Sequence, residues 1–217
     1  MKRTLRVLIA AGPTIEPIDP VRFISNRSTG RMGYSLASVA AKLGYRVNLI
    51  SGPTGITPPK RVRFRRIETA LELRREILRE LKKADVLLMP SAVSDFRPAS
   101  FSRAKIKSRK PFTLRLTKNA DILATIPANR RKNKILVGFC LETGNLLKNA
   151  ARKLKNKKLD LMVANRITKH ASPFGAGAKT VYLLNKHGQV KILKKMPKTG
   201  IARAILDTIE ELCYTST

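Results

Sequence analysis

The sequence predicts an α/β fold in which a doubly wound, mostly parallel sheet carries a C-terminal hairpin and a final helix. Short apolar runs alternate with segments of helical periodicity, the runs are nearly continuous, and turn residues separate them. Continuous apolar strands are typical of a parallel sheet covered by helices on both faces. Ligands of such sheets bind outside the carboxyl ends of the strands, so the loops there are the candidate functional segments.

The first half of the chain carries a separate signal for each expected element. Gly44 stops the first helix, and Thr69 with Glu72 forms a capping box that starts the second. The expected order is a strand over Leu5–Ala10, a long loop over Gly12–Arg27, a helix opened by Ser28-Thr29-Gly30, a strand over Val47–Ile50, a half-buried strand over Val62–Ile67, a helix over Ala70–Leu81 and a buried parallel strand over Ala84–Pro90.

The second half repeats the alternation and ends in a hairpin, which His187-Gly188 signals between two apolar stretches. A chain of 217 residues suffices for one sizeable core, so we expect a single domain over residues 1–217. The expected order is an irregular segment over Ser91–Ser108, alternating strand residues Phe112, Leu114 and Leu116, a short helix from Asp121, a strand over Ile135–Leu141, a helix that buries Leu147, Ala150, Ala151 and Leu154, a strand over Leu161–Ala164, hairpin strands over Thr180–Leu184 and Val190–Leu193, and a helix with Ile201, Ile205, Thr208 and Leu212 on one side.

The composition is that of a folded but unusually basic protein. Its 45 Lys and Arg residues face 14 Asp and Glu, a formal net charge of +31, which can indicate a polyanionic partner. The basic residues are spread along the whole chain, and only 5% of residues are aromatic, so stacking platforms for nucleic acid are scarce. We therefore expect a solvated basic surface and disfavour nucleic acid as the main partner.

The sequence also disfavours a membrane or exported protein. No run of about 18 apolar residues occurs, and Lys2, Arg3 and Arg6 interrupt any leader-like start. Cys140 and Cys213 lack the spacing of a zinc site or a disulfide framework. We expect two reduced thiols in a cytoplasmic protein without membrane contact.

The loop and helix start between the first two strands suggest an anion site, but not one for a dinucleotide. Gly30-Arg31-Met32-Gly33 supplies only a GxxG, and close helix–strand packing explains such glycines equally well. The second strand ends in Leu49-Ile50-Ser51, without the acid that holds a ribose hydroxyl, and no P-loop pattern occurs. A Rossmann-like scaffold for a different phosphate ligand remains.

Seven blocks follow one another over nearly the whole chain: AGPTIEPIDPVRFISNRSTGRMG (11–33), MPSAVSDFRP (89–98), KIKS (105–108), KNADIL (118–123), VGFCLET (137–143), KLKNKKLDLMVAN (153–165) and FGAGAKTVYLL (174–184). In sequence and in order, they resemble the family of phosphopantothenoylcysteine synthetase (phosphopantothenate–cysteine ligase), the synthetase half of the bacterial bifunctional coenzyme A biosynthesis flavoprotein.

The resemblance implies a two-step ligation in coenzyme A biosynthesis. The carboxylate of 4′-phosphopantothenate attacks the α-phosphate of CTP, which the family implies over ATP, and forms an acyl-cytidylate with release of pyrophosphate. The amine of L-cysteine then displaces CMP. The resemblance further implies Mg²⁺ held mainly by phosphates, a homodimer and a separate phosphopantothenoylcysteine decarboxylase as a partner. The alternative is a basic nucleic-acid-binding protein on the same scaffold.

The resemblance also assigns roles to three residues near the substrate. Asn26 would contact phosphopantothenate and support turnover of the acyl intermediate, with its amide donating to the acyl carbonyl; the alternative is a helix-capping loop residue. Arg22 would bind the substrate phosphate or carboxylate, and the alternative is a surface arginine. Lys105 would stabilise charge during nucleotidyl transfer, in a motif that ends here in Ser108.

For the nucleotide, the resemblance implies segments at two strand ends and one helix. Phe139 would lie against the base unless it is a core phenylalanine. Lys153 and Lys157 repel each other at this helical spacing unless an anion bridges them, which favours a triphosphate contact over a solvated face. The implied nucleotide residues are Met89, Pro90, Ser91 (also a substrate contact), Asp95, Lys105, Ala120, Asp121, Ile122, Leu123, Phe139, Lys153 and Lys157.

The chain departs from the family pattern at a few positions. Ser91 and Ser94 add two hydroxyls beside the nucleotide, and Ala120 replaces a proline. The segment from Lys105 to Asp121 is shorter than in the bifunctional enzymes, so we expect an abbreviated flap. FGAGAKT lacks the acidic residue common after Phe-Gly.

Overall fold

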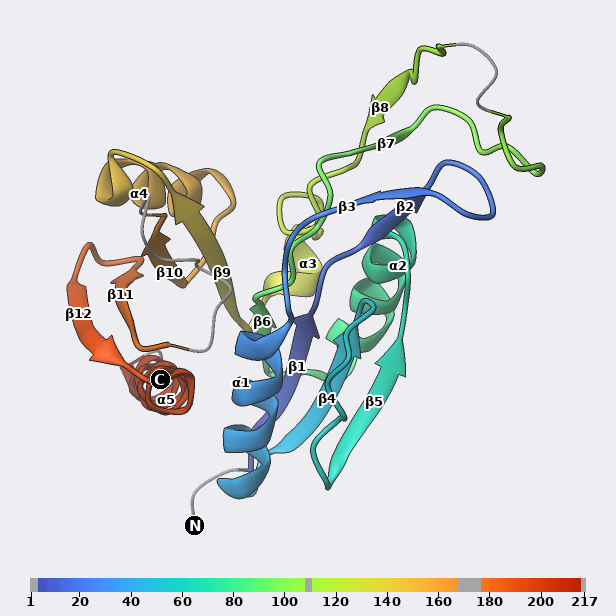
Figure 1. Ribbon diagram of the computed structural model, residues 1–217. Coiled ribbons are helices and arrows are strands. Elements are labelled where there is room, and N and C mark those ends of the chain that lie inside the picture. The colour runs from blue at the N-terminus through green and yellow to red at the C-terminus, as the bar shows by residue number, and fades with distance from the viewer. Residues whose placement is uncertain (1–3, 108–110, 168–176, 216–217) are drawn as a thin grey trace.

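The computed structural model describes residues 4–107, 111–167 and 177–215. Its centre is an eight-stranded sheet in the order β12-β11-β10-β9-β6-β1-β4-β5 (Figure 1). The six strands from β10 to β5 run parallel, and β11 and β12 are antiparallel additions, so the expected Rossmann-like sheet and its hairpin are confirmed. The strands are β1 (Arg6–Ala11), β4 (Arg46–Ser51), β5 (Val62–Arg66), β6 (Val86–Met89), β9 (Ile135–Glu142), β10 (Leu161–Arg166), β11 (Lys179–Asn185) and β12 (Val190–Met196).

Helices cover both faces of the sheet because the central strands are apolar on both sides. Val7 and Ile9 of β1 belong to the core under α1 and α5, whereas Leu8 and Ala10 belong to the core under α2 and α4. Within the described residues no helix is long and apolar enough to cross a membrane. The helices are α1 (Arg31–Lys42), α2 (Ala70–Glu80), the 3₁₀ turn η1 (Leu81–Lys83), α3 (Ala128–Arg131), α4 (Leu146–Asn156) and α5 (Lys198–Thr215).

Two short two-stranded sheets project from the body as an arm, which we define as residues 15–25, 96–107 and 111–118 (Figure 1). The long loop contains the first pair, β2 (Ile15–Pro17) and β3 (Phe23–Ser25). The second pair is β7 (Phe96–Pro98) and β8 (Leu116–Lys118). Strand β7 lies within the segment that we expected to be irregular, and Leu116 is the expected strand residue that belongs to β8, whereas Phe112 and Leu114 precede it. Ser108 and residues 174–176, which the motifs include, lie outside the described residues.

Four local expectations meet different outcomes. The capping box of α2 is confirmed, with Glu72 N donating to Thr69 Oγ1 over 3.2 Å. The helix expected from Asp121 is wrong: the chain forms a turn closed by Thr125 N and Asp121 O, and α3 starts only after Pro127, which restricts the backbone before it. The strand β5 is confirmed, but its expected half burial is wrong, because β5 is the sheet edge and most of its side chains are exposed.

The expected inner face of α4 is right in part. Ala150 and Leu154 are buried, whereas Leu147 is 43% exposed and Ala151 is also exposed.

Candidate functional site

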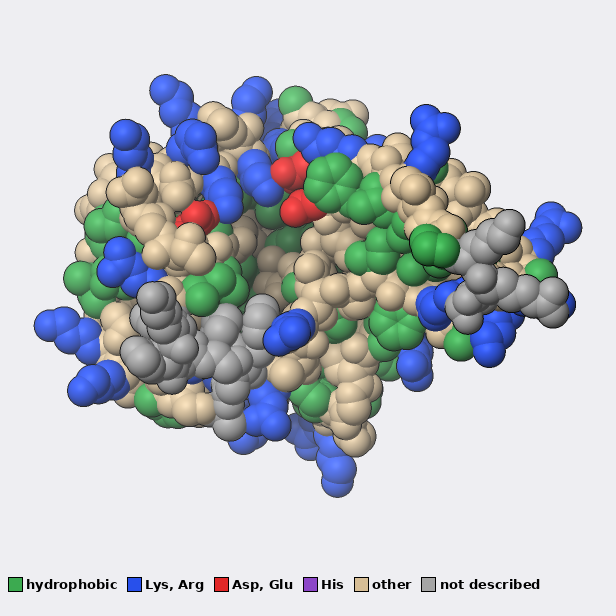
Figure 2. Space-filling view, turned by 45° about the horizontal axis from the view of Figure 1, so that its top comes forward, with side chains coloured by type: hydrophobic (Ala, Val, Ile, Leu, Met, Phe, Trp, Pro, Cys, Tyr) green, Lys and Arg blue, Asp and Glu red, His purple; other side chains and the backbone are tan. Residues whose placement is uncertain are grey.

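A cavity of about 880 Å³ opens at the carboxyl ends of the parallel strands, where the sequence placed the functional loops. It is the hollow at the centre of Figure 2, with Lys and Arg side chains around it. The segment before α1, the end of β6, residues 118–123, strand β9 and the first residues of β11 and α5 contribute to its lining. Its volume is sufficient for a nucleotide with part of a second substrate.

The start of α1 borders the cavity because two glycines let it approach the sheet. Gly30 caps the helix with a φ of 74°, and Ser28 to Met32 line the cavity. A Cβ at Gly33 would lie 2.5 Å from the Cβ of Ala11 in β1. Close helix–strand packing, the simpler explanation of the GxxG, therefore holds for Gly33, and the helix N-terminus still faces the ligand space.

Asn26 is held against the segment after β6. Its Nδ2 donates to the carbonyl oxygens of Ala92 and Val93, each over 3.1 Å. Both amide hydrogens are therefore used within the protein, so the expected donation to an acyl carbonyl does not fit this arrangement, and Oδ1 is the atom left for a substrate. The alternative of a helix cap is also absent, because Gly30 occupies that position.

Ser91 and Ser94, the two serines that depart from the family pattern, also lie in the segment after β6, where it meets the long loop. Ser91 Oγ donates to Gly12 O over 2.9 Å, and Ser94 N donates to Thr14 Oγ1 over 3.0 Å. Ser94 is only 5% exposed, and its hydroxyl has no partner among the described residues. These bonds fix the end of β6 to the long loop, so Ser91 has a structural hydrogen bond of its own.

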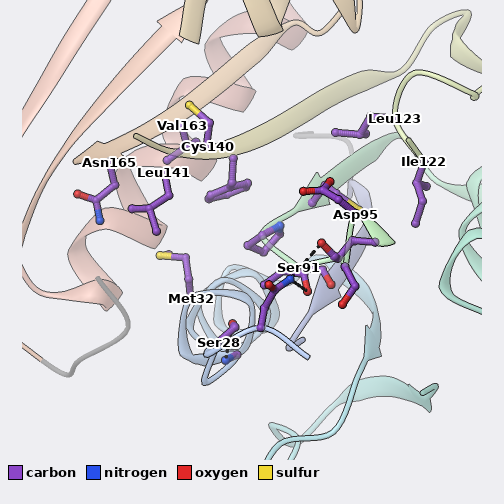
Figure 3. A pocket seen from close by; sticks show the side chains of 18 of the residues that line it. Ser28, Met32, Ser91, Asp95, Ile122, Leu123, Cys140, Leu141, Val163 and Asn165 are labelled. Atoms are coloured by element: carbon purple, nitrogen blue, oxygen red, sulfur yellow. Dashed lines mark hydrogen bonds between the residues drawn. The ribbon is translucent and has the colours of Figure 1, made fainter. Parts of the chain in front are cut away.

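The structure gathers all the residues expected near the nucleotide except Lys105. Figure 3 shows Asp95, Ile122 and Leu123 on one side of the cavity and Cys140, Val163 and Asn165 on the other. Phe139 is half-buried, packs against the core under α1 and α5, and also lines the cavity, so both interpretations of it apply. The gathered residues are Met89, Pro90, Ser91, Asp95, Ala120, Asp121, Ile122, Leu123, Phe139, Lys153 and Lys157.

Lys153 and Lys157 line the cavity with their charges already paired. Lys153 Nζ lies 2.6 Å from Glu142 Oε1, and Lys157 Nζ lies 2.7 Å from Asp121 Oδ2. Burial acts to raise the pKa of Glu142, but the hydrogen bond and charge of Lys153, together with Asn149 and Arg152, outweigh it and the net shift is downward. Carboxylates thus relieve the repulsion that favoured a triphosphate contact, and that contact stays a prediction.

Arg22 and Lys105 do not line the cavity of this chain and lie in the arm. The Asp19 side chain, fully buried, accepts from Arg22 Nε over 3.0 Å and from Ile106 N over 3.1 Å, while Arg22 also donates to Ile106 O over 2.7 Å. Arg22 above all, against the effect of burial, holds the pKa of Asp19 well below its usual range. The Asp19–Arg22 pair thus fastens the segment next to Lys105, whose side chain is exposed.

Five cations that line the cavity were not among the expected site residues: Arg27, Arg31, Lys118, Lys179 and Lys198. Arg31 stood within the GxxG, but no pattern linked it to Lys179 and Lys198, which lie far later in the chain. Cys140 also lines the cavity, and burial raises the pKa of its thiol to about 11, which leaves it protonated and a poor nucleophile at neutral pH.

Comparisons with known proteins agree with one another. The profile of the family described as the DNA/pantothenate metabolism flavoprotein C-terminal domain matches residues 3–213. The Coenzyme A biosynthesis bifunctional proteins CoaBC of Borreliella burgdorferi and Bacillus subtilis are 41% and 40% identical over 204 and 208 residues, 93% and 95% of this chain. The chain spans about half the length of these relatives, 51% of each.

Solved structures show the same fold. The crystal structure of the C-terminal domain of CoaBC superposes with a TM-score of 0.84 at 34% identity and covers 97% of this chain and 96% of that chain. A Cab2 variant in complex with phosphopantothenate-cysteine has a TM-score of 0.81 at 17% identity, covering 98% of this chain and 89% of that chain. At that identity the likeness shows the fold alone.

Proposed function

We propose that this chain, which belongs to the family of the DNA/pantothenate metabolism flavoprotein C-terminal domain, joins 4′-phosphopantothenate to L-cysteine in the cytoplasm. The observation that carries the proposal is the cavity, which collects Asn26 and the implied nucleotide residues other than Lys105 at the carboxyl ends of one parallel sheet. Nothing in the comparisons supports the nucleic-acid-binding alternative.

In the first step, a carboxylate oxygen of phosphopantothenate forms a bond to the α-phosphorus of the nucleotide, and the bond to the bridging oxygen of pyrophosphate breaks. The cavity offers seven cationic lining residues against two carboxylates, Asp95 and Asp121, which favours a polyanionic reactant. Lys153 and Lys157 remain part of this field, although Glu142 and Asp121 offset their charge. The residues after β6 and at 120–123 enclose the base and ribose.

In the second step, the cysteine amine attacks the acyl carbonyl, and CMP leaves with the electron pair of the carbonyl–oxygen bond. Asn26 Oδ1 is suited to accept a hydrogen bond from this amine, since Ala92 and Val93 fix the orientation of the amide. The carbonyls that hold Nδ2 thus give Asn26 a positioning role in amide formation. Enclosure of the cavity would also protect the acyl-nucleotidylate from water.

The residues present fit a magnesium ion that is held mainly by phosphates. Within the described residues no group of three His, Cys, Asp or Glu side chains could hold a metal by itself. Asp95 lines the cavity and would be a ligand, whereas Asp121 is engaged by Lys157. Mg²⁺ keeps few protein ligands in such sites and, when bound, neutralises phosphate charge.

The arm supports a homodimer as the functional form. Six large apolar side chains of the arm are between 49% and 60% exposed, a concentration that marks an interaction surface. A second copy would cover them, and its arm could bring Lys105 and Arg22 to a cavity that this chain leaves without them. The six residues are Val21, Phe23, Phe96, Phe101, Phe112 and Leu116.

The test is the release of pyrophosphate and CMP from CTP with phosphopantothenate and cysteine. We expect pyrophosphate to depend on CTP and phosphopantothenate, and CMP with the amide product to depend on cysteine as well. No product with either CTP or ATP would overturn the proposal. We propose CTP over ATP because the matched curated relatives are bacterial, and a larger thermal shift with CTP than with ATP is the expected result.

A further inference from the structure

Three cationic side chains meet at the end of the cavity formed by α1 and α5. Arg31 is the first residue of α1, Lys179 the first of β11 and Lys198 the first of α5, and all three line the cavity. The two helices pack against each other on one face of the sheet (Figure 1), and the first residues of both helices line the same cavity.

The charges of Arg31 and Lys179 act on Lys198, and no carboxylate compensates the charge of Lys198. Burial first, and then the charges of Lys179 and Arg31, lower the pKa of the Lys198 amine, and no acidic group raises it. In the part of the chain that the structure describes, neither Arg31 nor Lys198 forms an ion pair. At the other end of the cavity, by contrast, Lys153 and Lys157 each hold a carboxylate.

The helix positions of two of these cations are also unfavourable in the free protein. A helix N-terminus carries partial positive charge and is stabilised by acidic residues in its first turn. Neither α1 nor α5 has an acidic residue there, and each begins with a cation instead. The two helix ends and the charges of Arg31 and Lys198 therefore repel one another across the same space, and a bound anion would turn each repulsion into an attraction.

We propose that Arg31, Lys179 and Lys198 bind the terminal phosphates of the nucleotide and hold the pyrophosphate that leaves. This inference rests on the proposed function and deepens it. When the carboxylate attacks the α-phosphorus, the breaking bond leaves its electron pair on the bridging oxygen, so the pyrophosphate gains negative charge. Cations at that place stabilise the charge as it develops.

Inorganic pyrophosphate is the probe, because its binding does not depend on ligase activity. Calorimetric titration at low ionic strength should show that Lys198→Gln and Arg31→Gln each weaken pyrophosphate binding about tenfold, the loss expected for one charge-assisted hydrogen bond. Lys194→Gln, an exposed position on β12, removes the same charge from the surface and should leave the affinity unchanged. Lys198→Arg should retain most of the pyrophosphate affinity of the parent protein.

A stability measurement separates binding from structure. Because the substitutions relieve repulsion, Lys198→Gln and Arg31→Gln should unfold at the same or a higher temperature than the parent without ligand, yet gain less from pyrophosphate. Unchanged pyrophosphate affinity in both variants would overturn the inference, as would weakened phosphopantothenate binding with unchanged pyrophosphate binding. Pyrophosphate binding that the variants weaken in a chain without ligase activity would keep the site and overturn only the proposed function.

Discussion

The cavity and the arm are built in opposite ways. Backbone and side-chain hydrogen bonds join the walls of the cavity, as Asn26 does with Ala92 and Val93, and the sheet beneath is buried on both faces. The arm consists of three-residue strands whose large apolar side chains face outward, and one buried acid, Asp19, fastens its two halves. The cavity is formed within one chain, whereas the arm exposes an apolar surface of the kind that a partner covers.

The largest expected effects come from one substitution in each of these regions. Lys105→Gln should reduce pyrophosphate release on the order of 100-fold, the size of one lost charge contact in the transition state. Asn26→Asp should leave that step and stall amide formation, because a carboxylate would face the carbonyls of Ala92 and Val93. Asn156→Asp, on the exposed side of α4, is the matched charge control.

Mixing the two variants tests whether the arm serves a partner's cavity. If Lys105 acts in the site of a second copy, mixed dimers contain one intact site, and the mixture should recover about a quarter of the parent turnover. If both residues serve the cavity of their own chain, every site carries a defect and no turnover returns. Normal pyrophosphate release by Lys105→Gln alone would show that the lysine is misassigned.

The difference between cavity and arm also explains how far the sequence could be interpreted. Apolar runs and glycine positions determine the parallel strands, and topology then brings their carboxyl ends together, so the place of the cavity could be predicted, whereas its individual residues were implied by the family resemblance. The pairing of Lys153 with Glu142 could not, since it depends on how α4 packs against β9. The meeting of Arg31 with Lys179 and Lys198 requires the packing of α1 on α5, for which no local pattern exists.

A smaller effect should follow from loosening the arm while its charges stay in place. Asp19→Asn would turn an amide donor toward Arg22 and Ile106 N, so the segment beside Lys105 would lose its attachment. We expect about a tenfold fall in kcat for pyrophosphate release with little change in the KM for CTP, because ground-state nucleotide contacts lie in the cavity.

Asp85→Asn is the matched control for this change. Asp85 accepts from the backbone and guanidinium of Arg6 over 2.7 to 3.1 Å, which is the same kind of pairing, and neither residue lines the cavity. It should lower stability without changing kcat. An equal fall in kcat for both variants, or none for Asp19→Asn, would show that the arm attachment has no part in the first step.

The smallest effect concerns a paired carboxylate of the cavity. Burial acts to raise the pKa of Asp121, but Lys157, with the backbone N–H groups of Ala124 and Leu123, outweighs it and the net shift is downward. Its ionised form therefore stabilises the fold above the ordinary carboxylate pKa of about 3.9, and this contribution is lost as pH falls through the lower folded-state value. Asp121→Asn should cost less than about 1 kcal/mol at neutral pH, as for other partly exposed pairs. Urea unfolding across a pH series should show the difference from the parent shrinking in acid, and a difference that grows in acid would contradict the assigned direction.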